Sequence, residues 1–226
     1  MFTKRLIAAL AIILAIISPV SAQRLARERV TQVELTTSEG RILLQLYNDT
    51  PIHRDNFVRN VKAGIYDGRT FNRVVPDFVI QCGEEQAEDT VTAEIRYPQR
   101  FHRRGVLAMG RCTDDPEHEF RSADQQFYIV WGKTYSADDI DKFAQRMHES
   151  TFGRYEMSDS VRQYYATNPG APWLDGSFTI FGEVIDGLDV VERIQSAPTN
   201  PSTQSPLQPV VIKKAQVSVR YRSRQK

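Results

Sequence analysis

The sequence predicts a mainly β domain of the barrel or sandwich class. Short strand-like runs separated by turn residues recur along the chain, as they do in barrels and sandwiches. Two segments with apolar residues at helical spacing interrupt these runs. The length of 226 residues suits one domain with a full core. A polar segment at about 133–172 breaks the pattern, and we expect it to be an insertion.

The first residues have the three zones of a secretory signal. Two basic residues precede an apolar run from Leu6 to Ile17, and the small residues from Val20 to Ala22 predict cleavage before Gln23. The alternative is a membrane anchor, but the run of about 12 residues is shorter than the roughly 20 that cross a bilayer. We therefore expect export to the periplasm or the extracellular space, with no membrane attachment after cleavage.

Four parts are expected along the chain. They are a signal peptide at 1–22, a mobile leader at 23–29, a folded domain at 30–222 that includes the insertion, and a tail at 223–226. The 29 basic and 28 acidic residues are dispersed. Such a near-neutral chain offers no basic field for nucleic acid, which we exclude as a partner. We also expect a monomer.

The folded domain is expected to open with a hairpin and a helix. Two strand-like runs, Val30–Thr37 and Ile42–Tyr47, flank a turn that ends in Gly40. Apolar residues then recur at helical spacing in Pro51–Gly64, and the glycine at its end is a typical helix stop. This segment is predicted to be an amphipathic helix.

Shorter strands and a second helix complete the domain. The strand candidates are Thr70–Val75, Phe78–Gln81, Thr92–Ile95, Val106–Met109, Gln126–Trp131 and Thr179–Val184. A helix is predicted at Leu188–Ile194, and a long, half-buried strand at Pro209–Tyr221. The insertion is predicted to contain two polar helices, Ala137–His148 and Ser158–Ala166.

Three motifs in a fixed order carry the specific information about function. The first is Phe-Asn-Arg-Val-Val-Pro-Asp-Phe-Val-Ile-Gln-Cys-Gly-Glu at 71–84. The second is Gly-Val-Leu-Ala-Met-Gly at 105–110, followed by Asp-Gln-Gln-Phe-Tyr-Ile at 124–129. The third is Trp-Leu-Asp-Gly-Ser-Phe-Thr-Ile-Phe-Gly-Glu-Val at 173–184. Together they resemble the cyclophilins.

The resemblance extends over about 30–219, apart from the insertion. It implies a closed, eight-stranded antiparallel barrel capped by two helices, a form without exposed sheet edges. It also implies peptidyl-prolyl cis-trans isomerase activity on polypeptides that contain Xaa-Pro bonds. The substrate groove of this family lies on the outer face of the barrel.

The resemblance assigns roles residue by residue. Arg73 matches the catalytic arginine, and Gln81 is expected to position it. The expected substrate-binding residues are Phe78, Val79, Met109, Gly110, Arg111, Gln126, Tyr128, Trp173, Leu174 and Phe178. The alternative is that Phe78, Met109 and Phe178 are ordinary core residues and that Arg73 is a surface salt-bridge partner.

The chemistry of Xaa-Pro rotation explains these residue types. Delocalisation of the nitrogen lone pair into the carbonyl gives a barrier of about 18–20 kcal/mol. In the twisted transition state the lone pair returns to nitrogen, so a guanidinium donor aimed there stabilises that state more than the planar one. The reaction needs no nucleophile, and we expect no metal or cofactor. The four histidines also lack paired metal-ligand spacing.

Several residues depart from the family pattern. Arg111 stands where asparagine is common, which suggests a preference for an acidic residue near the proline. Phe178 replaces a histidine and loses a polar edge. Trp173 keeps the position associated with cyclosporin binding, so cyclosporin-like molecules are candidate ligands. Cys82 and Cys112 flank the groove, and export would permit a disulfide between them. Two free buried thiols are the alternative.

Two functional classes and two roles for the insertion remain open. The chain is either an active isomerase of exported proteins or a non-catalytic module or chaperone that holds proline-containing segments in the same groove. The presence of Arg73 favours the enzyme. The insertion ends just before Trp173, so it either borders the groove and screens large substrates or is a solvated decoration. We favour the decoration.

Overall fold

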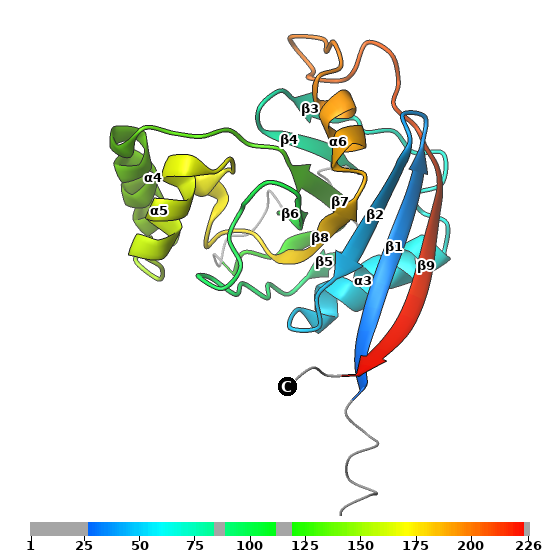
Figure 1. Ribbon diagram of the computed structural model, residues 1–226, viewed down its shortest axis with the longest axis horizontal. Coiled ribbons are helices and arrows are strands. Elements are labelled where there is room, and N and C mark those ends of the chain that lie inside the picture. Colours follow the sequence, from blue (N-terminus) through cyan, green and yellow to red (C-terminus); the bar gives the residue numbers. More distant parts are fainter. Residues whose placement is uncertain (1–26, 84–88, 112–118, 224–226) are drawn as a thin grey trace, which may run out of the picture. The chain divides into compact units, whose positions relative to one another are not determined.

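The computed structural model describes residues 27–83, 89–111 and 119–223 (Figure 1). The chain divides into two compact units, one of Met1–Val30 with Val219–Lys226 and one of Thr31–Ser218. Within the first unit, Arg222 Nε donates to Glu28 Oε2 at 3.0 Å. The predicted signal peptide lies outside the described residues and stays a prediction.

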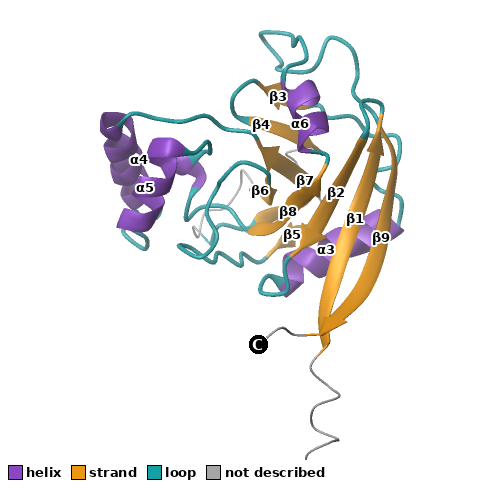
Figure 2. Ribbon diagram, in the orientation of Figure 1, coloured by secondary structure: helices purple, strands orange, loops and turns teal. Residues whose placement is uncertain are grey.

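The described chain contains nine strands in one antiparallel sheet (Figure 2). Their order across the sheet is β3-β4-β7-β6-β8-β2-β1-β9, and β5 pairs with β7. The strands are β1 (Arg27–Thr37), β2 (Arg41–Leu46), β3 (Arg73–Val75), β4 (Val79–Cys82), β5 (Thr90–Val91), β6 (Val106–Arg111), β7 (Ser122–Val130), β8 (Ile180–Asp186) and β9 (Ile212–Ser223).

The predicted closed barrel of eight strands is not confirmed. The sheet has nine described strands, and β3 and β9 stand at the two ends of its path. The backbone before β3 meets the backbone at the start of β9: Phe71 N donates to Val210 O at 2.9 Å, and Ile212 N donates to Arg69 O at 2.8 Å. These bonds flank a single isolated bridge, Thr70 to Val211, rather than a strand ladder.

One predicted strand is wrong. The strand expected at Thr92–Ile95 is absent, and a two-residue strand, β5, lies just before it. The reason is that Glu94 has other partners. Its carboxylate accepts from the backbone N–H groups of Ile52 and His53 at 3.1 and 2.9 Å, and its own N–H donates to Thr179 Oγ1. At the other end of the chain, β1 begins at Arg27, inside the predicted leader.

The described chain has four α-helices, and all four lie where the sequence predicts them. They are α3 (Pro51–Lys62), α4 (Ala137–Ser150), α5 (Asp159–Thr167) and α6 (Leu188–Gln195). A short 3-10 helix, η1 (Pro172–Leu174), follows α5. Ser136 caps α4, because its hydroxyl accepts from the N–H of Asp139. In Figure 1, α4 and α5 form a pair beside the strands.

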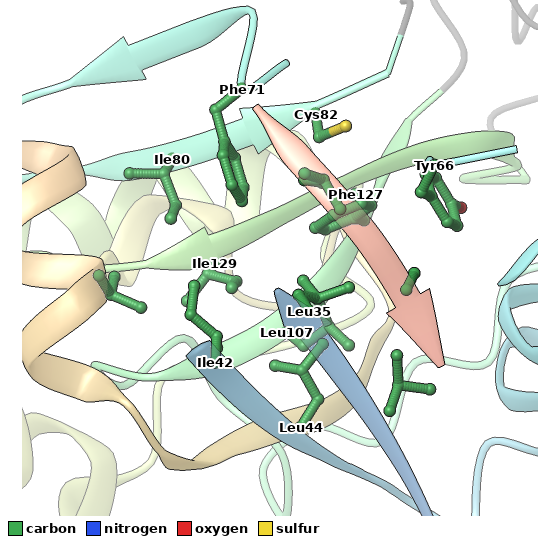
Figure 3. Close-up of a cluster of buried hydrophobic side chains, with 14 of the residues drawn as sticks. Leu35, Ile42, Leu44, Tyr66, Phe71, Ile80, Cys82, Leu107, Phe127 and Ile129 are labelled. Atoms are coloured by element: carbon green, nitrogen blue, oxygen red, sulfur yellow. The ribbon is translucent and has the colours of Figure 1, made fainter. Parts of the chain in front are cut away.

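The main core lies on one face of the sheet (Figure 3). Leu35, Leu44, Leu107 and Ile129 are fully buried there and come from β1, β2, β6 and β7. Phe57 of α3 packs against this face, with ring centroids 5.3 Å from Phe127 and 5.2 Å from Phe181. Because side chains alternate across a strand, the residues between these core positions point to the opposite face.

A buried polar cluster anchors the start of α3. Besides its two bonds to backbone N–H groups, the Glu94 carboxylate lies 2.8 Å from His53 Nδ1. The other ring nitrogen, His53 Nε2, lies 3.0 Å from Ser122 Oγ on β7. Burial alone would raise the pKa of Glu94, but the hydrogen bonds from His53 and Ile52 leave that pKa below its ordinary value. The cluster joins the helix N-terminus to the sheet.

Candidate active site

A cavity of about 460 Å³ opens on the sheet face opposite the core. Its floor comes from alternate residues of neighbouring strands: Val79 and Gln81 from β4, and Gln126 and Tyr128 from β7. The residues between them, such as Ile80 and Phe127, point into the core. The remaining lining residues are Arg73, Phe78, Gly110, Arg111, Leu174 and Phe178.

Two glutamines hold the Arg73 guanidinium at the edge of the cavity. Arg73 and Gln81 are direct partners across the β3–β4 pair, and Arg73 Nη1 donates to Gln81 Oε1 at 3.2 Å. Arg73 Nε donates to Gln204 Oε1 at 2.7 Å. The carbon of the guanidinium also lies 5.8 Å from the ring centroid of Phe78. The remaining N–H groups of Nη1 and Nη2 are not used by these two bonds.

A third glutamine, Gln126, also lines the cavity. Gln126 is 4% exposed, and its Nε2 has no hydrogen-bond partner among the described residues. The side chain covers Gly110, where an added Cβ would lie 1.9 Å from Gln126 Oε1. A side chain at position 110 would therefore displace the Gln126 amide. Burying an unpaired amide is costly, so Nε2 is a donor suited to a ligand carbonyl.

The rest of the cavity is an apolar pocket. Phe78, Val79, Leu174 and Phe178 line it, and the Phe178 ring stands edge-on to that of Tyr128 with centroids 5.9 Å apart. An apolar pocket excludes water, which strengthens the field of a nearby guanidinium. The site thus combines a fixed cation, an unpaired amide donor and a pocket for an uncharged ring.

Comparison with known proteins agrees with this geometry. The model of the family "Cyclophilin type peptidyl-prolyl cis-trans isomerase/CLD" matches residues 32–217. The chain belongs to the cyclophilin family. A peptidyl-prolyl cis-trans isomerase of Schizosaccharomyces pombe is 32% identical over 192 residues, which cover 82% of this chain and 98% of the relative. One of Acinetobacter baylyi is 32% identical over 208 residues, which cover 88% and 89% of the two chains.

Solved structures show the same fold. A cyclophilin-type isomerase of Cryptosporidium parvum matches with a TM-score of 0.60 at 20% identity and covers 84% of this chain and 98% of its own. A second structure of that protein, determined in the presence of the dipeptide Ala-Pro, matches with a TM-score of 0.60 at 21% identity. The mainly β cyclophilin fold is thereby confirmed.

Two of the predicted site residues do not line the cavity of this cyclophilin. Met109 is fully buried in the main core, because it lies one residue before Gly110 on β6 and so faces the other side of the sheet. Met109 is therefore a core residue and not the groove residue that the sequence predicted. Trp173 stands behind the cavity wall, with its ring 5.0 Å from that of Phe78. The other predicted residues all line the cavity.

The insertion packs against the back of this wall. Phe143 of α4 contacts Trp173 with ring centroids 5.2 Å apart, and Tyr135 approaches the same indole at 5.8 Å. The inner side of α4 is buried through Ile140 and Met147. These contacts favour the alternative in which the insertion borders the groove over the solvated decoration. Its apolar face and the groove wall share one aromatic cluster.

Gln204 is a site residue that the sequence motifs did not indicate. It lies 131 positions beyond Arg73 in a loop between α6 and β9. The backbone there has a φ of +58°, a left-handed conformation that is unusual for glutamine. Hydrogen bonds on both sides support it: Val74 N donates to Gln204 O, and Gln204 N donates to Asn200 O, each at 2.8 Å. A non-glycine residue kept in this conformation is consistent with a functional constraint.

The predicted disulfide stays a prediction. Cys82 is fully buried in the main core, and Cys112 lies outside the described residues. As a thiol, Cys82 has its pKa raised to about 12 by burial, which makes it a poor nucleophile. Within the ranges that the structure describes, no group of three or more His, Cys, Asp or Glu residues could hold a metal ion. No helix in these ranges is long and apolar enough to span a bilayer.

Proposed function

We propose that this cyclophilin accelerates cis/trans rotation of Xaa-Pro bonds and that Arg73 stabilises the twisted amide. The two-glutamine clamp on Arg73 beside an apolar pocket carries the proposal. Uncatalysed rotation takes tens of seconds or longer. Turnover in milliseconds requires the barrier to fall by about 6 kcal/mol, since each 1.36 kcal/mol is tenfold.

Binding and catalysis are divided between the two parts of the site. The pocket of Phe78, Leu174 and Phe178 takes the proline ring and excludes water. Gln126 Nε2 donates to a peptide carbonyl and holds the chain on one side of the bond. Because Arg73 is fixed before substrate arrives, its free N–H groups meet the proline nitrogen without reorganisation cost. The Arg73 donor stabilises the twisted state, in which the lone pair has returned to nitrogen, more than the planar state. We therefore expect Arg73 to raise kcat.

The first test is an exchange assay on an Ala-Ala-Pro-Phe peptide, followed by NMR line shape or exchange spectroscopy. We expect wild-type protein to bring cis/trans exchange into the range of tens per second or faster. Saturable peptide binding without faster exchange would favour the alternative, a module or chaperone that only holds proline-containing segments. A peptide that neither binds nor exchanges faster would contradict both functions.

Two finer features of specificity are tested in the same assay. Arg111 lines the cavity, and its Cζ lies 4.5 Å from the centroid of the Phe120 ring. The Cζ of Arg154 lies 5.0 Å from the same centroid. These two cations support a preference for an acidic residue near the proline. A rate unchanged when glutamate replaces alanine before the proline would count against it. Cyclosporin is proposed to compete for the cavity, and undiminished exchange in its presence would exclude that.

Loss of the Gln204 side chain is expected to slow the reaction without weakening binding. In Gln204→Ala the guanidinium keeps only its bond to Gln81, so Arg73 samples other orientations. We expect kcat/KM to fall about tenfold, the equivalent of one hydrogen bond to a charged group, with KM within about twofold of wild type. Gln208→Ala, an exposed glutamine farther along the same loop, is the matched control. A tenfold rise in KM with constant kcat would assign Gln204 to binding instead.

The site of action is proposed to be outside the cytoplasm. The support is the three-zone pattern at residues 1–22. Expression of the full chain in a bacterial host, followed by mass spectrometry of the fractionated protein, tests it. We expect a mature N-terminus at Gln23 in the periplasm or medium. An intact Met1 in the cytoplasm would contradict export without affecting the proposed activity.

A further inference from the structure

A buried chain of hydrogen bonds runs from the insertion to the back of the cavity. Tyr165 on α5 donates its hydroxyl to Asp175 Oδ2 at 2.8 Å. Asp175 Oδ1 accepts from the backbone N–H of His102 at 2.7 Å and lies 2.8 Å from His102 Nδ1. His102 Nε2 lies 2.9 Å from the hydroxyl of Tyr128, whose ring lines the cavity.

The chemistry of the four groups fixes the direction of these bonds. In the neutral imidazole, the ring nitrogen beside the carboxylate carries the proton, so His102 Nδ1 donates to Asp175 and Nε2 is the acceptor. Burial raises the pKa of Tyr128 and of Tyr165 well above the ordinary 10, so both hydroxyls keep their protons and are able to donate. The Tyr128 hydroxyl therefore donates to His102.

The insertion completes this chain. Asp175 is fully buried, and a buried carboxylate needs several donors to offset its lost hydration. Two of its donors come from His102, and the third is the hydroxyl of Tyr165. Gly170 permits the approach, since an added Cβ there would lie 2.4 Å from the Tyr165 ring and 2.6 Å from His102 O. A shorter connection without α5 would leave Asp175 Oδ2 without this donor.

His102 controls both aromatic walls of the proline pocket. Its ring is stacked with that of Tyr128, with centroids 6.1 Å apart and planes inclined by 14°. It also meets the Phe178 ring edge-on at 6.2 Å. Because His102 Nε2 accepts a hydrogen bond from the Tyr128 hydroxyl, that polar group points out of the pocket. The cavity side of Tyr128 is then as apolar as a phenylalanine.

We infer that the insertion supports the proline pocket from behind: Tyr165 of the insertion and the nearby Asp175 are positioning residues for His102, and His102 keeps the Tyr128 hydroxyl out of the cavity. The inference rests on the proposed function and adds to it a role for the insertion in affinity for the uncharged proline ring. This chain of hydrogen bonds affects substrate binding, because it shapes the pocket and contacts neither Arg73 nor the rotating bond.

The test compares His102→Leu in two backgrounds. In the wild-type background the Tyr128 hydroxyl loses its acceptor and turns toward water in the cavity. We expect KM and the dissociation constant of an Ala-Ala-Pro-Phe peptide to rise about tenfold, with kcat nearly constant. In the Tyr128→Phe background there is no hydroxyl to release. There the same substitution is expected to change both constants less than about twofold.

A milder pair of variants guards against misfolding. Tyr165→Phe removes one donor to Asp175 and keeps the ring, and we expect a KM rise of about threefold. Tyr164→Phe on the same helix is the control, because its hydroxyl is not part of the chain; we expect its KM to be unchanged. An equal effect of His102→Leu in both backgrounds, or an unchanged KM in folded Tyr165→Phe, would overturn the inference. Peptide titration measures the affinity of the pocket even if wild-type protein proves not to be an isomerase.

Discussion

Arg73→Ala is expected to lower kcat/KM about 10²- to 10³-fold, the effect of removing one preorganised donor from a site that stabilises developing charge. The lost interaction is made in the transition state, so the fall should appear in kcat. The apolar pocket that takes the proline ring remains. We expect the dissociation constant of the peptide to stay within about threefold of wild type. Exchange spectroscopy gives the rate, and titration gives the binding constant.

The choice of controls separates charge from geometry. Arg73→Lys keeps the charge but loses the planar fork that meets Gln81 and Gln204, so an intermediate rate is expected. Arg193→Ala removes an exposed arginine that pairs with Asp189 on α6 and should leave the rate unchanged. Equal rates for wild type and Arg73→Ala would sink the mechanism. A loss confined to peptide binding would make Arg73 a substrate anchor.

Glu94→Ala is expected to be the most destabilising single change considered. It removes a buried carboxylate that binds two N–H groups at the start of α3 and faces the buried His53 ring. Breaking such a buried pair costs about 3–5 kcal/mol. For a chain of this size we expect the thermal midpoint to fall by roughly 10 °C. Calorimetry or circular dichroism measures the midpoint, and isomerase activity at low temperature reports whether the groove survives.

Acid gives an independent check on Glu94. Its pKa is lowered in the folded state, so its contribution to stability is complete above the ordinary value of 4.5 and is lost as the pH falls through the lowered value. Glu94→Gln has no charge to lose and should show a smaller fall in stability below pH 4.5. It also turns an amide donor toward an N–H group, so it should be less stable than wild type at neutral pH. Identical acid profiles for the two proteins would contradict this account.

Local patterns predicted most of the fold, and the failures have physical causes. Apolar spacing and end signals located α3, α4, α5 and α6 to within a few residues. The strand expected at Thr92–Ile95 failed because Glu94 binds the distant start of α3, a contact that no local pattern records. The closed barrel that the resemblance implied is not confirmed, for a similar reason. It depends on how residues before β3 meet those at the start of β9, which are far apart in sequence.

The candidate site also has one group of residues that local patterns predicted and one that they did not. Residues inside the motifs, such as Arg73, Gln81 and Gln126, line the cavity because strand alternation brings them to one face. Alternation also explains the error at Met109, since its neighbour Gly110 already occupies that face. Gln204 lies outside every motif and reaches Arg73 only through the tertiary fold.

The two ends of the insertion meet at a single point. Lys133 and Gly170 exchange backbone hydrogen bonds, with N to O distances of 3.3 and 3.0 Å. The segment therefore leaves and rejoins the cyclophilin framework through one antiparallel bridge, and a change in its length leaves strand register unaltered. The entropy cost of closing a loop rises only slowly with its length, so this bridge tolerates inserted segments of very different size. An exchange of the segment there would leave Arg73 and the strands in place, but it would remove the Tyr165 hydroxyl from Asp175 and the Phe143 ring from Trp173.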